Sequence, residues 1–282
     1  MPPQFTSNKY AAPVMSLAYD AGPNNGPPVV FLHGLGARRQ DWRAILPEFA
    51  ADHQVFAPDL RGHGDSGRVP GEYRFTQYAD DIVPFLRDVV GEPAALVGHS
   101  LGGVIATVIA SDHPELVSTV VAADPPLFTR RHAPTGNTTK YRERFKRAQE
   151  LASSDMTEIG LFTMLQERSP NRPAYVTRAL ARNLIKLDPD VFTLALDGGQ
   201  QLDFDVEDLV ERLTRPMLLI LADQTNGAAT TEEDAAWASK KNSLISHLLI
   251  RDATHEIHHS HHDEFVKAVR EFTVVEEEED EE

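Results

Sequence analysis

A serine flanked by two glycines carries the strongest chemical signal in the sequence. Ser100 stands in the pentapeptide Gly98-His99-Ser100-Leu101-Gly102, which fits the pattern G-x-S-x-G. An apolar run at 94–97 precedes it and an apolar helical stretch at 101–110 follows, so the serine is expected on a tight strand-to-helix turn. Glycines on both sides permit this turn and let the hydroxyl project from the sheet edge. We predict that Ser100 is a nucleophile, and an ordinary strand-to-helix turn is the alternative.

A second glycine-rich turn, His33-Gly34-Leu35-Gly36, follows the apolar run at 28–32. Glycines let the backbone approach a ligand closely because they carry no side chain. We expect the N–H groups of Leu35 and Leu101 to stabilise the negative charge that develops on a substrate oxygen. The candidate substrate contacts are His33, Gly34, His99 and Trp42. For Trp42, packing inside the fold is the alternative.

The same turn imitates a dinucleotide-binding loop. Gly34 and Gly36 follow a strand, and Asp59 lies at the end of the next one, as in the nucleotide fingerprint. The third glycine of that fingerprint falls on Arg39, whose long side chain prevents close helix packing. The sequence therefore favours an oxyanion loop over a nucleotide site, and we predict no cofactor.

A histidine-rich segment follows the last predicted strand. Imidazole is the natural base for a serine nucleophile because its pKa lies near neutrality, and His255 is the first histidine of this segment. The run His255-Glu256-Ile257-His258-His259 also matches H-E-x-x-H, which binds zinc when both histidines lie on one helical face. Helix propensity is good only from about residue 263, so we predict that His255 is the base and that no metal is bound.

These motifs require a framework that brings distant turns to one edge. Short apolar runs alternate with helical stretches, which is typical of an α/β fold with a mostly parallel sheet. Strands are predicted at 14–19, 28–32, 54–57, 94–97, 116–123, 216–221 and 245–250, and helices at 101–110, 231–240 and 263–272. Residues 127–196 contain no predicted strand and are interpreted as a helical cap over the carboxyl edge of the sheet. Residues 1–126 and 197–275 then form the core, and 276–282 form a disordered acidic tail.

The serine turn, the glycine loop and the late histidine together resemble the serine hydrolases of the α/β-hydrolase fold, carboxylesterases among them. The resemblance covers nearly the whole chain and includes residues 58–66, Pro58-Asp59-Leu60-Arg61-Gly62-His63-Gly64-Asp65-Ser66, interpreted as scaffolding. It implies an eight-stranded, mostly parallel sheet flanked by helices, with the cap inserted after the sixth strand. It also implies a Ser-His-Asp triad that cleaves a small-molecule carboxylic ester of small to medium acyl or alcohol groups through an acyl-enzyme. Dehalogenases and epoxide hydrolases of this fold use a carboxylate where this chain has Ser100.

The acid of the triad departs from the commonest pattern of that family. In many members it follows the seventh strand, three residues beyond a small residue, and counting from Ala222 this position is Thr225. Two carboxylates remain, Asp124 at the end of the sixth strand and Asp223 at the end of the seventh. Some members carry the acid after the sixth strand, so Asp124 is the first choice and Asp223 the second.

Composition limits the remaining possibilities. The chain has 282 residues, of which 41% are apolar and 25% charged, so it is long enough for a large packed core. The absence of cysteine excludes thiolate chemistry and cysteine-held clusters. The net charge of −16, with seven of the acids in residues 276–282, argues against nucleic acid as a partner. Residues 1–20 lack the pattern of a signal peptide and no apolar run is long enough to cross a membrane, so a cytoplasmic location is expected.

Three alternatives to ester cleavage remain open. The same triad could open a lactone or hydrolyse a carbon–carbon bond, and no motif distinguishes these reactions. A protein of this type could also act as a ligand receptor with very slow turnover.

Overall fold

The computed structural model describes residues 3–128, 136–196 and 202–273, and its centre is one eight-stranded sheet with the order β1-β2-β4-β3-β5-β6-β7-β8. Strand β2 pairs antiparallel with β1 and with β4, and all other neighbours are parallel. This confirms the predicted mostly parallel, eight-stranded α/β-hydrolase sheet. The strands are β1 (Thr6–Ala11), β2 (Ser16–Ala21), β3 (Pro28–Leu32), β4 (Gln54–Pro58), β5 (Ala94–His99), β6 (Val117–Ala123), β7 (Met217–Leu221) and β8 (Ile245–Leu249).

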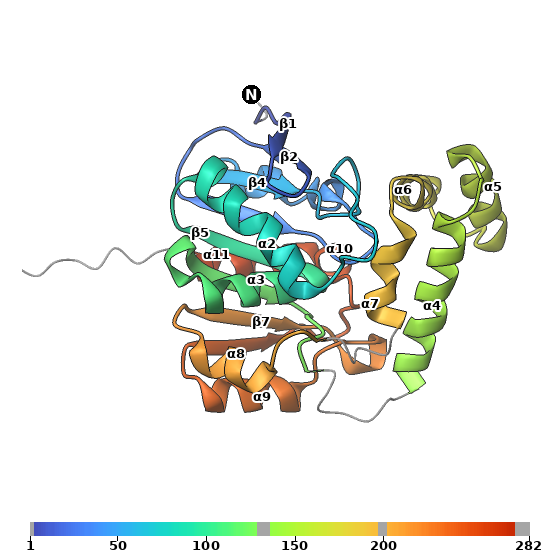
Figure 1. Ribbon diagram of the computed structural model, residues 1–282. Coiled ribbons are helices and arrows are strands. Elements are labelled where there is room, and N and C mark those ends of the chain that lie inside the picture. Colours follow the sequence, from blue (N-terminus) through green and yellow to red (C-terminus); the bar gives the residue numbers. More distant parts are fainter. Residues whose placement is uncertain (1–2, 129–135, 197–201, 274–282) are drawn as a thin grey trace, which may run out of the picture.

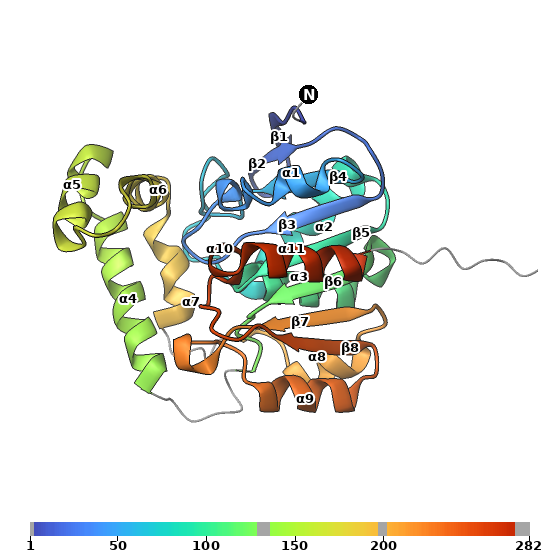
Figure 2. The same cartoon turned by 180° about the vertical axis from the view of Figure 1, so that it is seen from behind.

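Helices cover both faces of the sheet (Figures 1 and 2). One face carries α2 (Phe75–Phe85), α3 (Leu101–Asp112), α8 (Val206–Arg212) and α9 (Glu232–Lys241), and the other carries α1 (Leu46–Phe49) and α11 (His262–Thr273). Two apolar clusters, one under each layer, form the core. Helix α3 is buried along almost its whole length, which explains why its sequence is apolar on every side.

The chain between β6 and β7 forms a separate group of helices beyond the edge of the sheet (Figure 1). They are α4 (Gly136–Ala152), α5 (Glu158–Arg168), α6 (Ala174–Ile185) and α7 (Thr193–Leu196), after which α8 returns to the sheet. Parts of the predicted cap at 129–135, its junction at 197–201, and the predicted tail at 276–282 lie outside the described residues. A cap role for 127–196 is therefore kept as a proposal.

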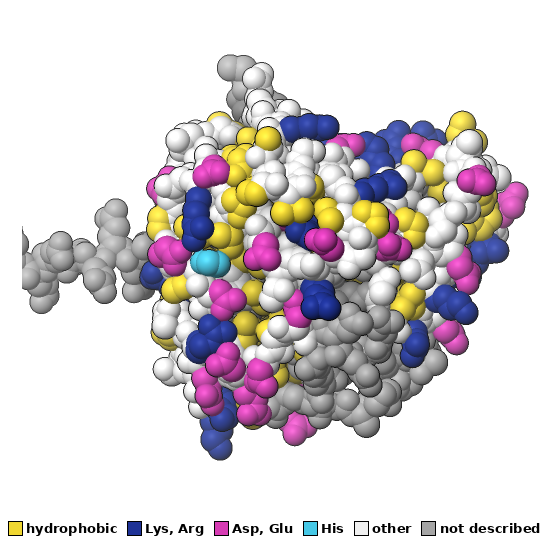
Figure 3. All heavy atoms as spheres, in the orientation of Figure 1, with side chains coloured by type: hydrophobic (Ala, Val, Ile, Leu, Met, Phe, Trp, Pro, Cys, Tyr) yellow, Lys and Arg dark blue, Asp and Glu magenta, His cyan; other side chains and the backbone are white. Residues whose placement is uncertain are grey.

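The outer surface carries charges of both signs. On the face in Figure 3, Lys and Arg side chains are interspersed with Asp and Glu. Such mixing is ordinary for a face in contact with water. No helix among the described residues is long and apolar enough to span a lipid bilayer.

Candidate active site

Ser100 occupies a strained turn between β5 and α3. Its φ of 50° lies in the left-handed region, which is uncommon for a residue with a side chain. The flanking glycines are sterically required: a Cβ on Gly98 would lie 2.2 Å from the carbonyl oxygen of Gly102, and one on Gly102 would lie 2.1 Å from that of Leu32. The sequence pattern thus produces the tight turn that it predicted.

Three side chains from distant parts of the chain meet at this turn. His255 Nε2 accepts a hydrogen bond from Ser100 Oγ at 3.1 Å, and His255 Nδ1–H donates to Asp124 Oδ2 at 2.6 Å. Ser100 follows β5, Asp124 follows β6, and His255 lies in the loop after β8. The Asp124 side chain is fully buried and that of His255 is 15% exposed. The arrangement allows His255 to remove the serine proton while Asp124 orients the ring.

Backbone donors hold the Asp124 carboxylate in place. Oδ1 accepts from the N–H groups of Ala229 and Thr230, both at 3.0 Å, and Oδ2 accepts from Ala229 N at 2.8 Å as well as from His255. Asp124 itself has a φ of 45°. These N–H groups satisfy the buried carboxylate oxygens and fix the direction in which Asp124 faces His255.

The second candidate acid serves its own loop. Asp223 caps the short helix η6 (Gln224–Asn226), where its Oδ1 accepts from the backbone and hydroxyl of Thr225 at 2.9 and 2.6 Å. Its Oδ2 accepts from Asp252 N at 3.1 Å. The hydroxyl of Thr225, followed by these backbone donors, lowers the pKa of Asp223. No hydrogen bond joins Asp223 to His255 among the described residues, so the structure brings Asp124, and not Asp223, to the imidazole.

Two backbone N–H groups are available to an oxyanion. Among the described residues, neither Leu35 N nor Leu101 N donates to another protein group. A hydrogen bond to the neighbouring loop fixes the loop that carries Leu35: His63 Nε2 accepts from Gly36 N–H at 3.1 Å. Burial lowers the pKa of His63 to about 3, so the ring is neutral and can accept. Through this bond the segment 59–66 supports the loop that carries Leu35.

Two of the predicted substrate contacts are wrong. The side chains of His33 and Trp42 are fully buried and present no surface to a substrate. His33 Nε2 accepts from Leu60 N at 3.0 Å, and burial lowers the pKa of His33 to about 4. Trp42 packs into the core against Phe31 and Phe265.

Gly34 and His99 have structural tasks beside the triad. His99 Nε2–H donates to the backbone carbonyl of His255 at 2.9 Å and thereby helps to place the base. Burial, followed by the neighbouring His258 and His255, holds the pKa of His99 well below its usual range. A Cβ on Gly34 would lie 2.7 Å from His99 Nδ1, so glycine is required for this close packing.

The helices beyond the sheet edge reach the triad through residues that sequence reasoning missed. The Tyr141 ring of α4 meets His255 at a centroid distance of 5.9 Å, and its hydroxyl donates to the carbonyl of Gly227. Burial, together with Asp124 and Glu256, raises the pKa of Tyr141 to about 12, so the hydroxyl keeps its proton. Phe145 stacks on Tyr141 and contacts Phe192 at 5.8 Å. No motif marks these aromatic residues, because their role depends on where α4 lies in space.

The H-E-x-x-H match does not form a helical zinc site. Helix α10 spans Ile257–Ser260, so His255 lies outside it. His255 is bound to Asp124 and Ser100, whereas His259 Nε2–H donates to Asp41 at 2.8 Å. The two histidines of the motif therefore serve different partners.

Comparisons with known proteins agree with this fold. A family model described as alpha/beta hydrolase fold matches residues 27–262. The magnesium-chelatase 30 kDa subunit of Rhodobacter capsulatus is 37% identical over 110 residues, which is 38% of this chain and 38% of that protein. The pimeloyl-[acyl-carrier protein] methyl ester esterase of Aeromonas hydrophila is 28% identical over 88% of this chain and 95% of its own.

A solved structure shows the same fold over almost the full length. The crystal structure of E-2-(acetamidomethylene)succinate hydrolase superposes with a TM-score of 0.76 at 23% identity, over 95% of this chain and 99% of the other. Several curated relatives are matched over only 28 to 38% of their own length.

Proposed function

This chain belongs to the alpha/beta hydrolase fold family, and on that premise we propose that it is a serine hydrolase of small-molecule carboxylic esters. One observation carries the proposal: an unbroken hydrogen-bonded chain runs from Ser100 Oγ through His255 to the buried Asp124 carboxylate. The N–H groups of Leu35, in the loop after β3, and of Leu101, at the start of α3, donate to no other protein group among the described residues, which supports a role as oxyanion donors.

The reaction proceeds in two halves. His255 Nε2 removes the Ser100 proton as Oγ attacks the ester carbonyl, and the N–H groups of Leu35 and Leu101 stabilise the oxyanion. His255 then protonates the departing alcohol, which leaves an acyl-enzyme. Water, deprotonated by the same ring, cleaves the acyl-enzyme and restores Ser100. Asp124 remains charged throughout and stabilises the imidazolium.

Two observations support an ester as the substrate and a small to medium acyl or alcohol group on it. The match to an esterase over 88% of this chain and 95% of that protein supports an ester over other acyl compounds. The stacked rings of Tyr141 and Phe145 are partly exposed, and Tyr141 contacts His255, so they offer an apolar surface beside the triad that suits an acyl or alcohol group of small to medium size. The helices α4–α7 would then act as the cap over this site.

Hydrolysis of p-nitrophenyl acetate, butyrate and octanoate by the wild type and by Ser100→Ala tests the proposal. We expect many turnovers by the wild type, an early burst of p-nitrophenol from the acyl-enzyme, and loss of turnover in Ser100→Ala. A lactone and a vinylogous diketone belong in the same panel, since preference for either would replace ester cleavage by another reaction of the same triad. Fewer than two turnovers with every substrate, together with tight ligand binding, would indicate a receptor and refute the proposal.

A further inference from the structure

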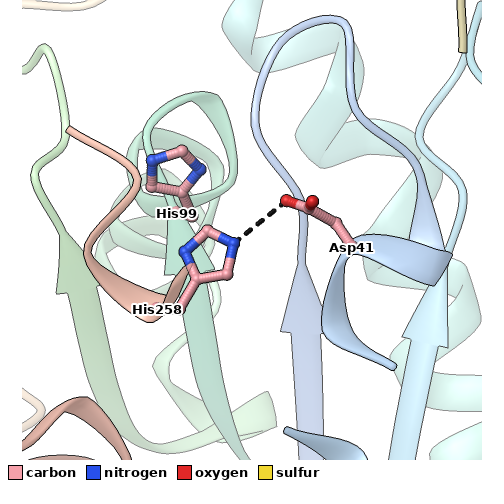
Figure 4. A group of neighbouring side chains, drawn as sticks. All are labelled: Asp41, His99 and His258. Atoms are coloured by element: carbon pink, nitrogen blue, oxygen red, sulfur yellow. Dashed lines mark hydrogen bonds and ion pairs between the residues drawn. The ribbon is translucent and has the colours of Figure 1, made fainter. Parts of the chain in front are cut away.

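A second cluster of metal-binding side chains lies beside the triad and takes no part in the proposed reaction. It consists of Asp41 in η1 (Arg39–Trp42), His99 at the end of β5, and His258 in α10. One ligand atom from each residue lies within 4.8 Å of the other two. Figure 4 shows the two rings side by side with the carboxylate facing them. These three residues are called the Asp41 cluster below.

Two buried nitrogens of the Asp41 cluster, His258 Nδ1 and His99 Nδ1, have no hydrogen-bond partner among the described residues, and the second faces the proposed ion. Because His99 Nε2–H donates to the carbonyl of His255, the neutral ring carries its lone pair on Nδ1. That atom is buried and has no hydrogen-bond partner among the described residues, and His99 as a whole is only 5% exposed. A buried acceptor without a partner destabilises the fold, so its retention requires an explanation.

The surroundings of this nitrogen suit an ion. Gly34 packs closely against His99 Nδ1, and a Cβ at this position would crowd the nitrogen at 2.7 Å. The Asp41 carboxylate is held by His258 Nε2–H at 3.0 Å and by His259 Nε2–H at 2.8 Å. The Asp41 side chain is 20% exposed, which gives an ion a path from solvent into the cluster.

We propose that the Asp41 cluster binds one divalent transition-metal ion, with zinc the best match, through a carboxylate oxygen of Asp41, Nδ1 of His99 and Nε2 of His258. Two imidazoles and one carboxylate form a common ligand set for zinc, with a fourth position left for water. The ion takes the place of the proton that His258 Nε2 donates to Asp41, and that proton moves to Nδ1, so the ring stays neutral and binds the ion through the Nε2 lone pair.

The geometry is close to that of a bound ion and requires one adjustment. Zinc ligands at about 2.0–2.1 Å from the metal lie about 3.3 Å from one another, and His258 Nε2 and Asp41 Oδ2 are 3.0 Å apart. The remaining spacings, up to 4.8 Å, must shorten by rotation of the His99 and Asp41 side chains. A ligating histidine usually donates its other N–H to a carbonyl or carboxylate, as His99 already does to His255.

The proposed site differs from the H-E-x-x-H reading. It leaves His255 free for the triad and uses His258 in place of the two motif histidines. It also couples to the reaction, because the ring of His99 would then connect the ion to the backbone of His255.

Titration of the full-length, chelator-treated protein with ZnCl₂ in a calorimeter tests the site. We expect one ion per chain in the wild type, and at least about tenfold weaker binding in Asp41→Asn and in His258→Gln. The double variant His261→Gln/His262→Gln is the matched control, because it removes two nearby histidines outside the cluster and should bind zinc as the wild type does. Co²⁺ at the same site should give the visible absorption of a low-coordinate N/O site in the wild type and in the control variant, but not in Asp41→Asn.

Thermal unfolding of each variant without metal shows whether the variant is folded, so that loss of zinc binding can be distinguished from loss of the fold. Asp41 lies at the edge of the buried cluster, so Asp41→Asn should fold even if His258→Gln does not, and zinc should raise Tm of the wild type but not of Asp41→Asn. The proposal is overturned if the wild type binds no zinc. It is equally overturned if folded Asp41→Asn binds zinc as well as the wild type, or if only the His261/His262 variant loses the ion.

Discussion

Replacement of Asp124 by asparagine should nearly abolish turnover while the fold survives. The carboxylate has two tasks: its oxygens accept three bonds from the N–H groups of Ala229 and Thr230, and Oδ2 accepts the proton of His255 Nδ1. An asparagine keeps one accepting oxygen for the backbone donors and then places its NH₂ group against His255 Nδ1. The ring must accept there, so its proton moves to Nε2, where it faces Ser100 and can no longer accept the serine proton.

The expected loss follows from this change of tautomer. Removing the orienting acid from a serine triad typically lowers kcat by about 10⁴-fold, which corresponds to about 5 kcal/mol of transition-state stabilisation. KM for a p-nitrophenyl ester should change little, since Asp124 is fully buried and touches no substrate. The assay is kcat and KM of the wild type, Asp124→Asn and the matched control Asp223→Asn, with Tm of each.

The control separates the two candidate acids. Asp223 caps its own turn and accepts one bond from Asp252 N, but it makes no bond to His255, so Asp223→Asn should keep kcat within a few-fold of the wild type. If Asp124→Asn retains more than a tenth of wild-type kcat, or if Asp223→Asn is the variant that collapses, the assignment of the triad acid is wrong.

Two further predictions concern stability. Gly102→Ala should lower the free energy of unfolding in urea by about 3 kcal/mol or more, because its Cβ would overlap the Leu32 carbonyl. Gly71→Ala, where φ is 80° but the space around the residue is open, should lower it by about 1–2 kcal/mol. Equal losses in the two variants would contradict the steric argument. Burial lowers the pKa of His33 and of His63, so as the pH falls below 6.5 the unfolded chain binds more protons than the folded chain. The free energy of unfolding must therefore decrease as the pH decreases. Each ring should contribute a loss of about 2 kcal/mol between pH 7 and pH 5. Urea unfolding of His63→Gln at both pH values should show a smaller loss than the wild type, and an unchanged difference would refute the buried neutral histidine.

The parts of the fold that were predictable are those where local pattern and burial agree. Strands β3 and β5 are buried along their whole length and read as continuous apolar runs. Strand β1 was missed because it is a polar edge strand, largely exposed and held by backbone pairing to β2 alone. The strand predicted at 14–19 is observed two residues later, at Ser16–Ala21.

For the site, the sequence predicted positions better than side-chain directions. Ser100 and Asp124 each follow a parallel strand, and the carboxyl ends of parallel strands share one edge, so their meeting was predictable. The ring of Trp42 is near the oxyanion loop in sequence, yet the turn at η1 sends it into the core against Phe31. The contact of Tyr141 with His255 depends on how α4 packs over the edge, which no local pattern records.

The position of the triad acid after β6, in place of the commoner position after β7, also explains why the loop after β7 carries no acid at Thr225. Strand β6 lies between β5 and β7, so an acid at the end of β6 is one strand nearer to Ser100 than an acid at the end of β7. With Asp124 in that place, the loop after β7 has no carboxylate to offer at Thr225, and instead its residues Ala229 and Thr230 donate N–H groups to Asp124. A carboxylate returned to the loop by Thr225→Asp should therefore not rescue Asp124→Asn. The N–H groups that would orient the new acid already point at residue 124, and recovery of more than a few per cent of kcat would show that this loop can still provide the acid.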